Sequence, residues 1–198
     1  VTPFARVIAA VCPGKVVFES GTGSGVLSIL AARAGARAVV CTGLDPSIAR
    51  FARANIRASG CADRITLLEK STLEVGAEDL SGLRPEVVIA ENLSTWQVTE
   101  PQNAVINHVR SHLARPDAVS IPERTFNFAE LCRAEYRFFD TIELRTHFFE
   151  FTGIRPALPA SPPALVSTFD YREETPISID REVVLTPWCS GTVNAIRL

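Results

Sequence analysis

The sequence has 198 residues, of which 46% are hydrophobic, and its formal net charge is −2 at pH 7. This length and apolar fraction suit one full domain and part of a second, with a sizeable core. The charge disfavours a protein that grips a nucleic-acid backbone over a long site, and no apolar run approaches the ~20 residues of a membrane span.

The first part of the sequence alternates between short β-branched runs and alanine-rich stretches. The β-branched runs predict buried strands at 15–19, 38–42, 64–68, 86–91 and 118–121. The alanine-rich stretches predict helices at 25–34, 47–59 and 102–114. This alternation predicts an α/β fold over residues 1–122, in which helices cover both faces of a doubly wound, mostly parallel sheet.

The pattern changes after Pro122, because predicted strands then follow one another without helices between them. They lie at 125–131, 141–145, 165–171, 183–186 and 192–198. We therefore expect a second region at 123–198, a smaller antiparallel and barrel-like part that serves substrate binding or dimerisation. The sequence opens at Val1 and stops inside a predicted strand, so we expect both natural ends to be missing.

A glycine-rich turn, Gly21-Thr22-Gly23-Ser24-Gly25, follows the first predicted strand and precedes the first predicted helix. Glycines permit a sharp turn and a close approach of ligand to backbone, and the helix start offers free N–H groups. The dinucleotide fingerprint requires a glycine where Val26 stands, so that class of ligand is disfavoured. A turn without ligand is also disfavoured, because three alternating glycines follow a carboxylate, Glu19.

Two glutamates flank the loop after the fourth predicted strand. Glu91 ends the strand, and Glu100 lies nine positions later at the start of a predicted helix. Two carboxylates can hold a planar guanidinium by paired, charge-assisted hydrogen bonds and can offset its charge. The structural alternative is that Glu100 only complements the helix start and that Glu91 pairs with a buried arginine.

These motifs resemble two known families. The pattern from Glu19 to Gly25 resembles motif I of the class I S-adenosylmethionine-dependent methyltransferases, which have a Rossmann-like fold. The pair Glu91 and Glu100 resembles the double-glutamate hairpin of the protein arginine methyltransferases, here in a short form of the bacterial or archaeal type. The resemblance implies S-adenosylmethionine as cofactor and Glu91 and Glu100 as catalytic residues. It also implies that the cofactor is bound by Glu19, Gly21, Gly23 and Gly25.

The predicted cofactor site departs from the family pattern at the second strand. The acidic residue that binds the ribose would fall where Gly43 stands, and Asp45 comes two residues later. Asp45 either contacts the ribose or caps the helix that follows, and the sequence leaves both readings open. By position, Ser71 and Thr72 are expected beside the adenine. If the ribose contact is missing, a catalytically silent subunit that works through binding has to be considered.

We therefore expect a methyltransferase that N-methylates a guanidinium or amine acceptor, on a protein or on an arginine-like small molecule. The alternative enzyme is an RNA or other small-molecule methyltransferase on the same scaffold. His108 and His112 lack a third ligand, so no metal site is expected. Five dispersed cysteines and no visible signal peptide favour reduced thiols in a cytoplasmic protein. Nucleic acid is a less favoured partner, no membrane is expected, and a homodimer is the candidate assembly.

Overall fold

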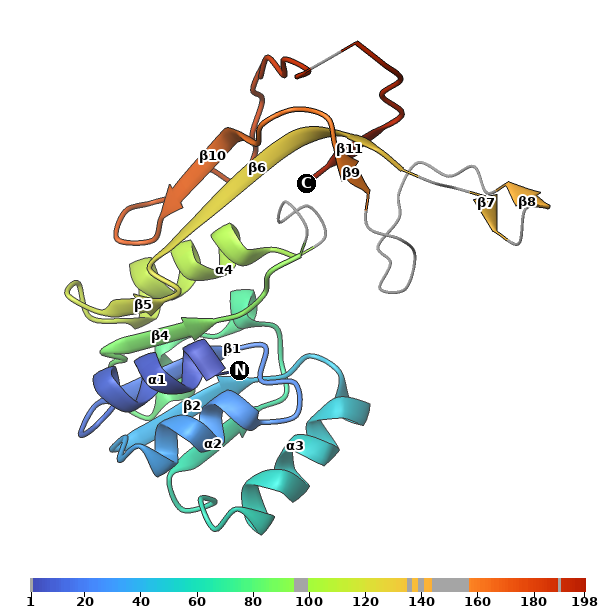
Figure 1. Ribbon diagram of the computed structural model, residues 1–198. Helices are drawn as coiled ribbons and strands as arrows, with labels where there is room; N and C mark the ends of the chain where they lie inside the picture. Colours follow the sequence, from blue (N-terminus) through green and yellow to red (C-terminus); the bar gives the residue numbers. More distant parts are fainter. Residues whose placement is uncertain (1, 95–99, 135–136, 139–140, 144–156, 189) are drawn as a thin grey trace. The chain divides into compact units, whose positions relative to one another are not determined.

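The computed structural model describes residues 2–94, 100–134, 137–138, 141–143, 157–188 and 190–198 (Figure 1). They form two compact units. The first comprises residues 1–125 together with 169–179, and the second comprises 126–168 together with 180–198. The first unit therefore takes back a late segment of the chain, which the expected division after residue 122 does not include.

A five-stranded parallel sheet forms the centre of the first unit, in the order β3-β2-β1-β4-β5. Its strands are β1 (Val16–Ser20), β2 (Ala38–Thr42), β3 (Ile65–Leu68), β4 (Val87–Ala90) and β5 (Val119–Ile121). Every residue of β1 and of β4 is buried, as in strands that helices cover on both faces. The predicted fold class is confirmed, with a Rossmann-like parallel sheet here and a separate small antiparallel sheet in the second unit.

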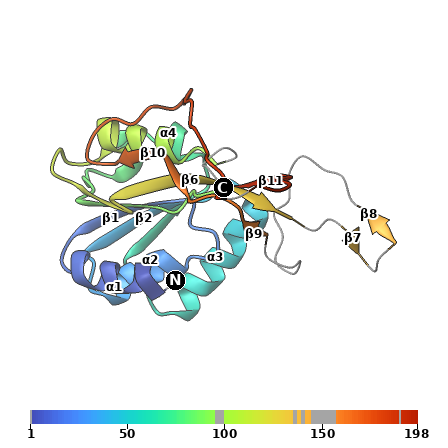
Figure 2. The same ribbon diagram turned by 45° about the horizontal axis from the view of Figure 1, so that its top comes forward.

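The two faces of the sheet carry different helices, as Figure 2 shows. Val17, Val39 and Ile89 pack with buried residues of three helices. These are α1 (Thr2–Val11), α2 (Val26–Arg33) and α3 (Pro46–Ala58). Phe18, Val40 and Val88 belong to a second cluster on the other face. That face is covered by two 3-10 turns, Thr72–Glu74 and Ala77–Leu80, and by the helical segment Gln102–Leu113.

Two helices differ from the sequence expectation. The sequence predicted no element before residue 15, yet α1 forms there and buries Ile8 against the sheet. The predicted helix at 102–114 is an α-helix, α4, only over Gln102–His108. A π-helical turn, Val109–Leu113, completes it, and the N–H of Ala114 donates to the carbonyl of Val109 at 2.8 Å.

The second unit contains short antiparallel strands around the long strand β6 (Arg124–Arg133). β10 (Ala164–Asp170), β11 (Ala195–Arg197) and β9 (Leu158–Pro159) pair with β6, and β7 (Arg137–Phe138) pairs with β8 (Ile142–Glu143). The strand predicted at 183–186 is wrong, because those residues form no strand and Val184 is 80% exposed. A β-branched run becomes a strand only where a neighbouring strand is available to pair with it.

Residues 169–179, which we call the return segment, pack against α4 and β4. Phe169 and Tyr171 are buried with Ala90 and Ile106. The phenol of Tyr171 donates to Asn103 Oδ1 at 3.2 Å, and Asn103 Nδ2 donates to the carbonyl of Pro176 at 2.8 Å. The return segment therefore covers the outer side of α4.

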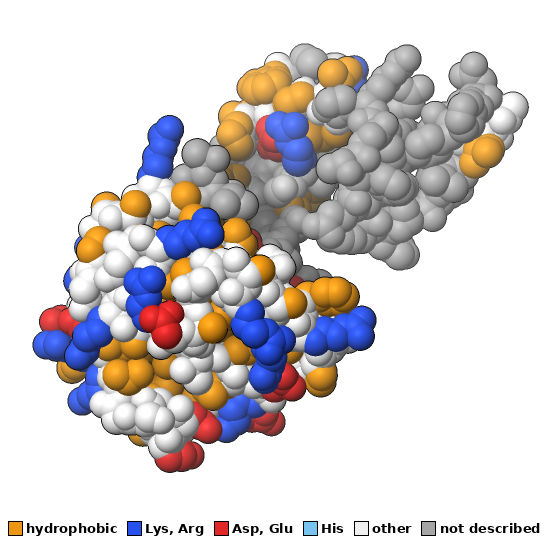
Figure 3. Space-filling model, turned by 90° about the horizontal axis from the view of Figure 1, so that it is seen from below, with side chains coloured by type: hydrophobic (Ala, Val, Ile, Leu, Met, Phe, Trp, Pro, Cys, Tyr) orange, Lys and Arg blue, Asp and Glu red, His pale blue; other side chains and the backbone are white. Residues whose placement is uncertain are grey.

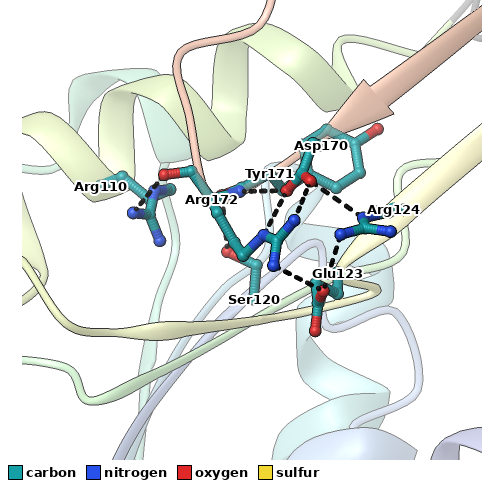
Figure 4. A network of polar contacts seen from close by, with 7 residues as sticks. All are labelled: Arg110, Ser120, Glu123, Arg124, Asp170, Tyr171 and Arg172. Atoms are coloured by element: carbon teal, nitrogen blue, oxygen red, sulfur yellow. Dashed lines mark hydrogen bonds and ion pairs between the residues drawn. The ribbon is translucent and has the colours of Figure 1, made fainter.

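A charged network fastens the start of the return segment (Figure 4). Asp170 accepts hydrogen bonds from Arg172 Nε at 2.8 Å and from Arg124 Nε at 2.9 Å. Arg172 also lies 3.6 Å from Glu123. Chiefly because of Arg172, and then Arg124, the pKa of the Asp170 carboxyl lies well below its usual range.

The surface of the first unit carries both signs of charge. On the face shown in Figure 3, Lys and Arg side chains are scattered among apolar and acidic ones. None of the helices in the described ranges has the length and apolar character needed to cross a bilayer.

Candidate active site

The glycine-rich turn and Glu91 follow neighbouring strands at the same edge of the sheet. β1 and β4 are parallel, and Ser20 is the register partner of Ala90. Gly21 and Glu91 therefore leave the sheet side by side at its carboxyl end. β1 pairs with β2 on its other side, so strand order reverses here, which is where open α/β sheets bind their ligands.

The backbone of the turn needs glycine at each alternate position. The φ angles of Gly21, Gly23 and Gly25 are +73°, +51° and +87°. A Cβ on Gly23 would meet no atom within 4 Å, so this residue borders open space. A Cβ on Gly25 would make only ordinary contacts of 3.5 Å with Ile56 and 3.6 Å with Ala52, so its backbone angle, not crowding, favours glycine there.

Glu19 lies beneath this turn, with 2% of its surface exposed. Its carboxylate accepts a hydrogen bond from Thr22 Oγ1 at 2.9 Å and another from Ser28 Oγ. Burial raises the pKa of the Glu19 carboxyl, and the hydroxyl donors of Ser28 and Thr22 oppose that rise. Glu19 therefore links Thr22 of the glycine-rich turn to Ser28 in the first turn of α2 through buried hydrogen bonds. Its expected part in binding the cofactor stays a prediction.

Three buried hydroxyls meet at the carboxyl edge of the sheet: those of Ser20 and Thr42, which end β1 and β2, and that of Thr72 in the first 3-10 turn. Thr72 Oγ1 is 2.8 Å from Ser20 Oγ and 2.7 Å from Thr42 Oγ1, and Thr42 Oγ1 accepts the N–H of Gly21 at 3.2 Å. Ser71 accepts the N–H of Leu73 at 3.3 Å and so begins a 3-10 turn. The adenine contacts expected of Ser71 and Thr72 stay predictions. The sequence interpretation missed Thr42, whose signal was its place at the end of β2.

Asp45 is the N-cap of α3. Its Oδ1 accepts the N–H of Ser47 at 2.7 Å, and this bond lowers the pKa of the Asp45 carboxyl. At Gly43, a Cβ would make only ordinary contacts of 3.7 Å, with Leu67 and Thr22. The absence of a side chain at Gly43 is therefore not imposed by crowding.

Glu91 and Glu100 are both exposed, and within the described residues neither carboxylate is paired with an arginine or lysine. The structural alternative for Glu91, an ion pair with a buried arginine, therefore finds no support there. The loop residues 95–99 lie outside the described part of the chain.

Gln102, the first residue of α4, contacts both sides of Glu91. Its Nε2 donates to the carbonyl of Ala90 at 2.8 Å, and its Oε1 accepts the N–H of Asn92 at 2.9 Å. Gln102 is fully buried. The side-chain amide of Asn92 reaches toward the glycine turn, with Nδ2 2.6 Å from the position of a Cβ on Gly21. Sequence reasoning missed Gln102 and Asn92, because neither belongs to a chemical motif.

A hollow of about 250 Å³ lies elsewhere, between α3 and the start of β3. It shares no residue with the predicted site. It is lined by Arg53, Ile56, Arg57, Ala62, Ile65 and Leu67.

Comparison with known sequences identifies one family model and several relatives. The family described as ribosomal protein L11 methyltransferase (PrmA) matches residues 7–111. An "Arginine N(omega)-methyltransferase" of Streptomyces achromogenes subsp. streptozoticus is 28% identical over 93% of this chain and 55% of its own length. The "Protein arginine N-methyltransferase 7" of Drosophila melanogaster is 29% identical over 60% of this chain and 17% of its own. The chain thus spans about half the length of the Streptomyces relative.

Several solved structures of similar fold are arginine methyltransferases by their descriptions. The Trypanosoma brucei PRMT1 enzyme-prozyme heterotetrameric complex with AdoHcy has a TM-score of 0.70 at 20% identity, over 87% of this chain and 58% of that one. Arabidopsis thaliana protein arginine methyltransferase 10 has a TM-score of 0.71 at 17% identity, over 86% and 58%. At these identities the likeness concerns the fold, and it extends beyond the parallel sheet.

Proposed function

The chain belongs to the ribosomal protein L11 methyltransferase (PrmA) family, and we propose that it transfers a methyl group from S-adenosylmethionine to a guanidinium nitrogen. The observation that carries this proposal is the register of Ser20 with Ala90, which puts the glycine turn and Glu91 at adjacent strand ends. A cofactor on the turn and an acceptor at Glu91 would then be neighbours, as transfer between them requires.

The residues at the turn fit the cofactor. Gly23 borders open space, and the N-terminus of α2 points its free N–H groups to the same edge of the sheet. Asn92 Oδ1 is buried, and no described residue donates to it. An ammonium group, such as that of the methionyl part, could supply this donor. Bound there, S-adenosylmethionine supplies an electrophilic methyl group.

Glu91 and Glu100 would bind and orient the acceptor. A guanidinium is planar, stays charged, and offers paired N–H donors to two carboxylates. Either acceptor must release a proton when it is methylated, and an ammonium group has neither the planar shape nor the paired donors that match two carboxylates. The pair therefore suits a guanidinium better than an amine.

The matches differ in the acceptor that their names suggest. The description of the family model names ribosomal protein L11, and its match ends at residue 111, within the unit that would hold the cofactor. The name of the Streptomyces relative gives arginine as the acceptor, and its match covers 93% of the chain, which includes most of the second unit. Because the acceptor is chosen outside the cofactor turn, we give the longer match more weight.

A panel of acceptors tests the proposal. The purified chain is incubated with S-adenosylmethionine and, separately, free arginine, arginine-containing peptides, lysine-containing peptides and RNA, and methylated products are identified by mass spectrometry. We expect products only with guanidinium acceptors. Transfer to RNA or lysine alone would overturn the acceptor class, and failure to bind S-adenosylhomocysteine in calorimetry would overturn the enzyme itself.

We further propose that the protein assembles as a homodimer. Leu44, Ile48 and Phe51 leave apolar side chains exposed around the start of α3, with exposures of 72%, 48% and 57%. Clustered exposed apolar side chains are typical of interaction surfaces. Light scattering over a range of concentrations should give twice the chain mass, and Phe51→Glu should reduce it to the monomer mass.

A further inference from the structure

Gln102 has no assigned role in the proposed reaction. It nevertheless forms hydrogen bonds with the residues on both sides of Glu91, and with the backbone of Glu100. We propose that Gln102 is the positioning residue of the site, which fixes the backbone of Glu91 and Glu100 relative to each other. The inference rests on the proposed function of these two glutamates.

The first contact is a clamp around the Glu91 residue. The Gln102 side-chain amide spans from the Ala90 carbonyl, which it donates to at 2.8 Å, to the Asn92 N–H, which it accepts at 2.9 Å. The Ala90 carbonyl is an acceptor and the Asn92 N–H is a donor. A reversed amide would therefore put its oxygen against the carbonyl and its NH₂ group against the N–H, and would lose both hydrogen bonds. The clamp therefore has one orientation, and it leaves Glu91 little freedom to rotate about its flanking peptides.

The second contact runs through the backbone of Gln102. Its N–H donates to the carbonyl of Glu100 at 3.0 Å, across Pro101, whose φ and ψ are −83° and 42°. These values are close to an inverse γ-turn, in which residues two apart are bonded directly. One residue thus holds the two ends of the loop, although Glu91 and Glu100 are separated by the undescribed residues 95–99.

Because Gln102 is buried, the loss of its two hydrogen bonds would destabilise the site. Gln102 is fully buried, and both partner groups belong to the end of a central strand and the residues just after it. Substitution by an apolar side chain would leave the Ala90 carbonyl and the Asn92 N–H without partners in a low-dielectric environment. Asn92 would also be released, and its side-chain amide lies against Gly21 in the glycine turn. The clamp thus sets the acceptor carboxylate relative to the cofactor turn.

Amide hydrogen exchange tests the clamp without any assay of activity. In the wild-type chain the Asn92 N–H should exchange slowly. Gln102→Met keeps the length of the side chain and removes both hydrogen bonds, so in this variant the Asn92 N–H should exchange at least tenfold faster. The matched control is Asn103→Leu, because Asn103 is the next residue of α4 and bonds only the return segment, through Tyr171 and Pro176. That variant should leave Asn92 exchange unchanged. Rapid Asn92 exchange in the wild type would overturn the proposal.

Kinetics then separate positioning from general stability. With the best guanidinium acceptor, Gln102→Met should lower kcat by about two orders of magnitude, with the KM for S-adenosylmethionine within about threefold of wild type. Asn103→Leu should keep kcat near wild type even where its melting temperature falls equally. An unchanged kcat in Gln102→Met, with fast Asn92 exchange, would overturn the positioning role while leaving the proposed function intact.

Gln102→Glu supplies a pH-dependent rescue. A protonated carboxyl can donate its O–H to Ala90 and accept from Asn92, as the amide does, whereas the carboxylate can only accept. The ratio of variant to wild-type kcat should therefore rise as pH falls, and the same ratio for Gln102→Met should stay flat. Parallel profiles of the two variants would contradict the clamp. If the wild type methylates no acceptor, the proposed function fails, and the exchange experiment still decides whether the clamp exists.

Discussion

The carboxylate of Asp45 accepts the backbone N–H of Ser47 at 2.7 Å, and Pro46 follows it as the first residue of α3. Sequence reasoning left Asp45 either as this helix cap or as the ribose contact. The cap is formed, and it occupies one carboxylate oxygen. The ribose contact stays a prediction, and the two roles respond differently to substitution.

Asp45→Ala removes both the cap and the charge, whereas Asp45→Asn keeps a good N-cap and removes only the charge. We expect Asp45→Ala to lower the melting temperature and Asp45→Asn to preserve it. If Asp45 also binds the ribose, Asp45→Asn should weaken S-adenosylhomocysteine binding about tenfold in calorimetry. Equal affinity in all three proteins would leave Asp45 as a cap alone.

Gly43→Asp tests the ribose position from the opposite direction. The modest contacts of a Cβ at Gly43 leave room for a carboxylate at the end of β2, where an acidic residue would accept the ribose hydroxyls. We expect S-adenosylhomocysteine affinity to rise by about tenfold. Calorimetry of Gly43→Asn, which has nearly the same volume without the charge, is the control. Unchanged affinity in both variants would mean that the cofactor does not pass this strand end.

The glycine turn can be tested against a matched glycine outside the site. Gly23 and Gly14 both have positive φ, +51° and +73°, and a Cβ on either would meet nothing within 4 Å. Alanine should therefore cost each about 1–2 kcal/mol of folding free energy through backbone strain. Only Gly23→Ala should weaken S-adenosylhomocysteine binding, by at least about tenfold, because only Gly23 lies at the carboxyl edge. Equal affinities in the two variants would remove the turn from the cofactor site.

Glu91→Gln and Glu100→Gln test whether these two carboxylates bind the acceptor. Each preserves shape and removes one charge, so we expect methyl transfer to a guanidinium acceptor to fall by about 10²–10³-fold. Affinity for S-adenosylhomocysteine should remain within about twofold, since the two carboxylates serve the acceptor. Glu86→Gln, also a glutamate beside β4 but at its amino end, is the control and should stay active. Full activity in both site variants would make these glutamates structural.

Glu19 should make stability depend on pH. Burial raises its pKa in the folded protein, so its favourable contribution is present below the ordinary glutamate pKa and is lost as pH rises through the folded-state value. From about pH 4 upward, the wild type should therefore lose stability relative to Glu19→Gln. Melting temperatures of both proteins at a series of pH values measure this change. Curves that stay parallel from pH 4 to 8 would contradict the raised pKa.

The parallel sheet could be predicted because its signals are local. Continuous burial appears in the sequence as an unbroken apolar run in β4 and as the apolar residues 16–18 in β1. Asp45, Pro46 and Gly60 delimit α3 by their own backbone preferences. The helix α1 was missed although Phe4, Ile8 and Val11 follow helical spacing, because the polar face that would complete the pattern is nearly absent from Thr2–Val11.

Features that depend on distant residues could not be predicted. The run at 183–186 has strand-like composition, but it pairs with no strand among the residues that the structure describes. Gln102 carries no chemical signature, since its role arises only where the end of β4 meets the start of α4. The candidate site was predicted through its charged and glycine residues, while the polar residues that hold them, such as Thr42 and Gln102, became visible only in three dimensions.

The return of residues 169–179 to the first unit makes that unit discontinuous in the order of synthesis. When residue 125 leaves the ribosome, every strand of the parallel sheet has been made, but Ala90 and Ile106 still lack the cover of Phe169 and Tyr171. The bond from Tyr171 to Asn103 closes a separation of 68 residues. Such long-range closure is slow compared with local helix formation. The nascent sheet therefore exposes Ala90 and Ile106 until the return segment has been translated, and premature termination before residue 169 would leave these apolar residues open to aggregation.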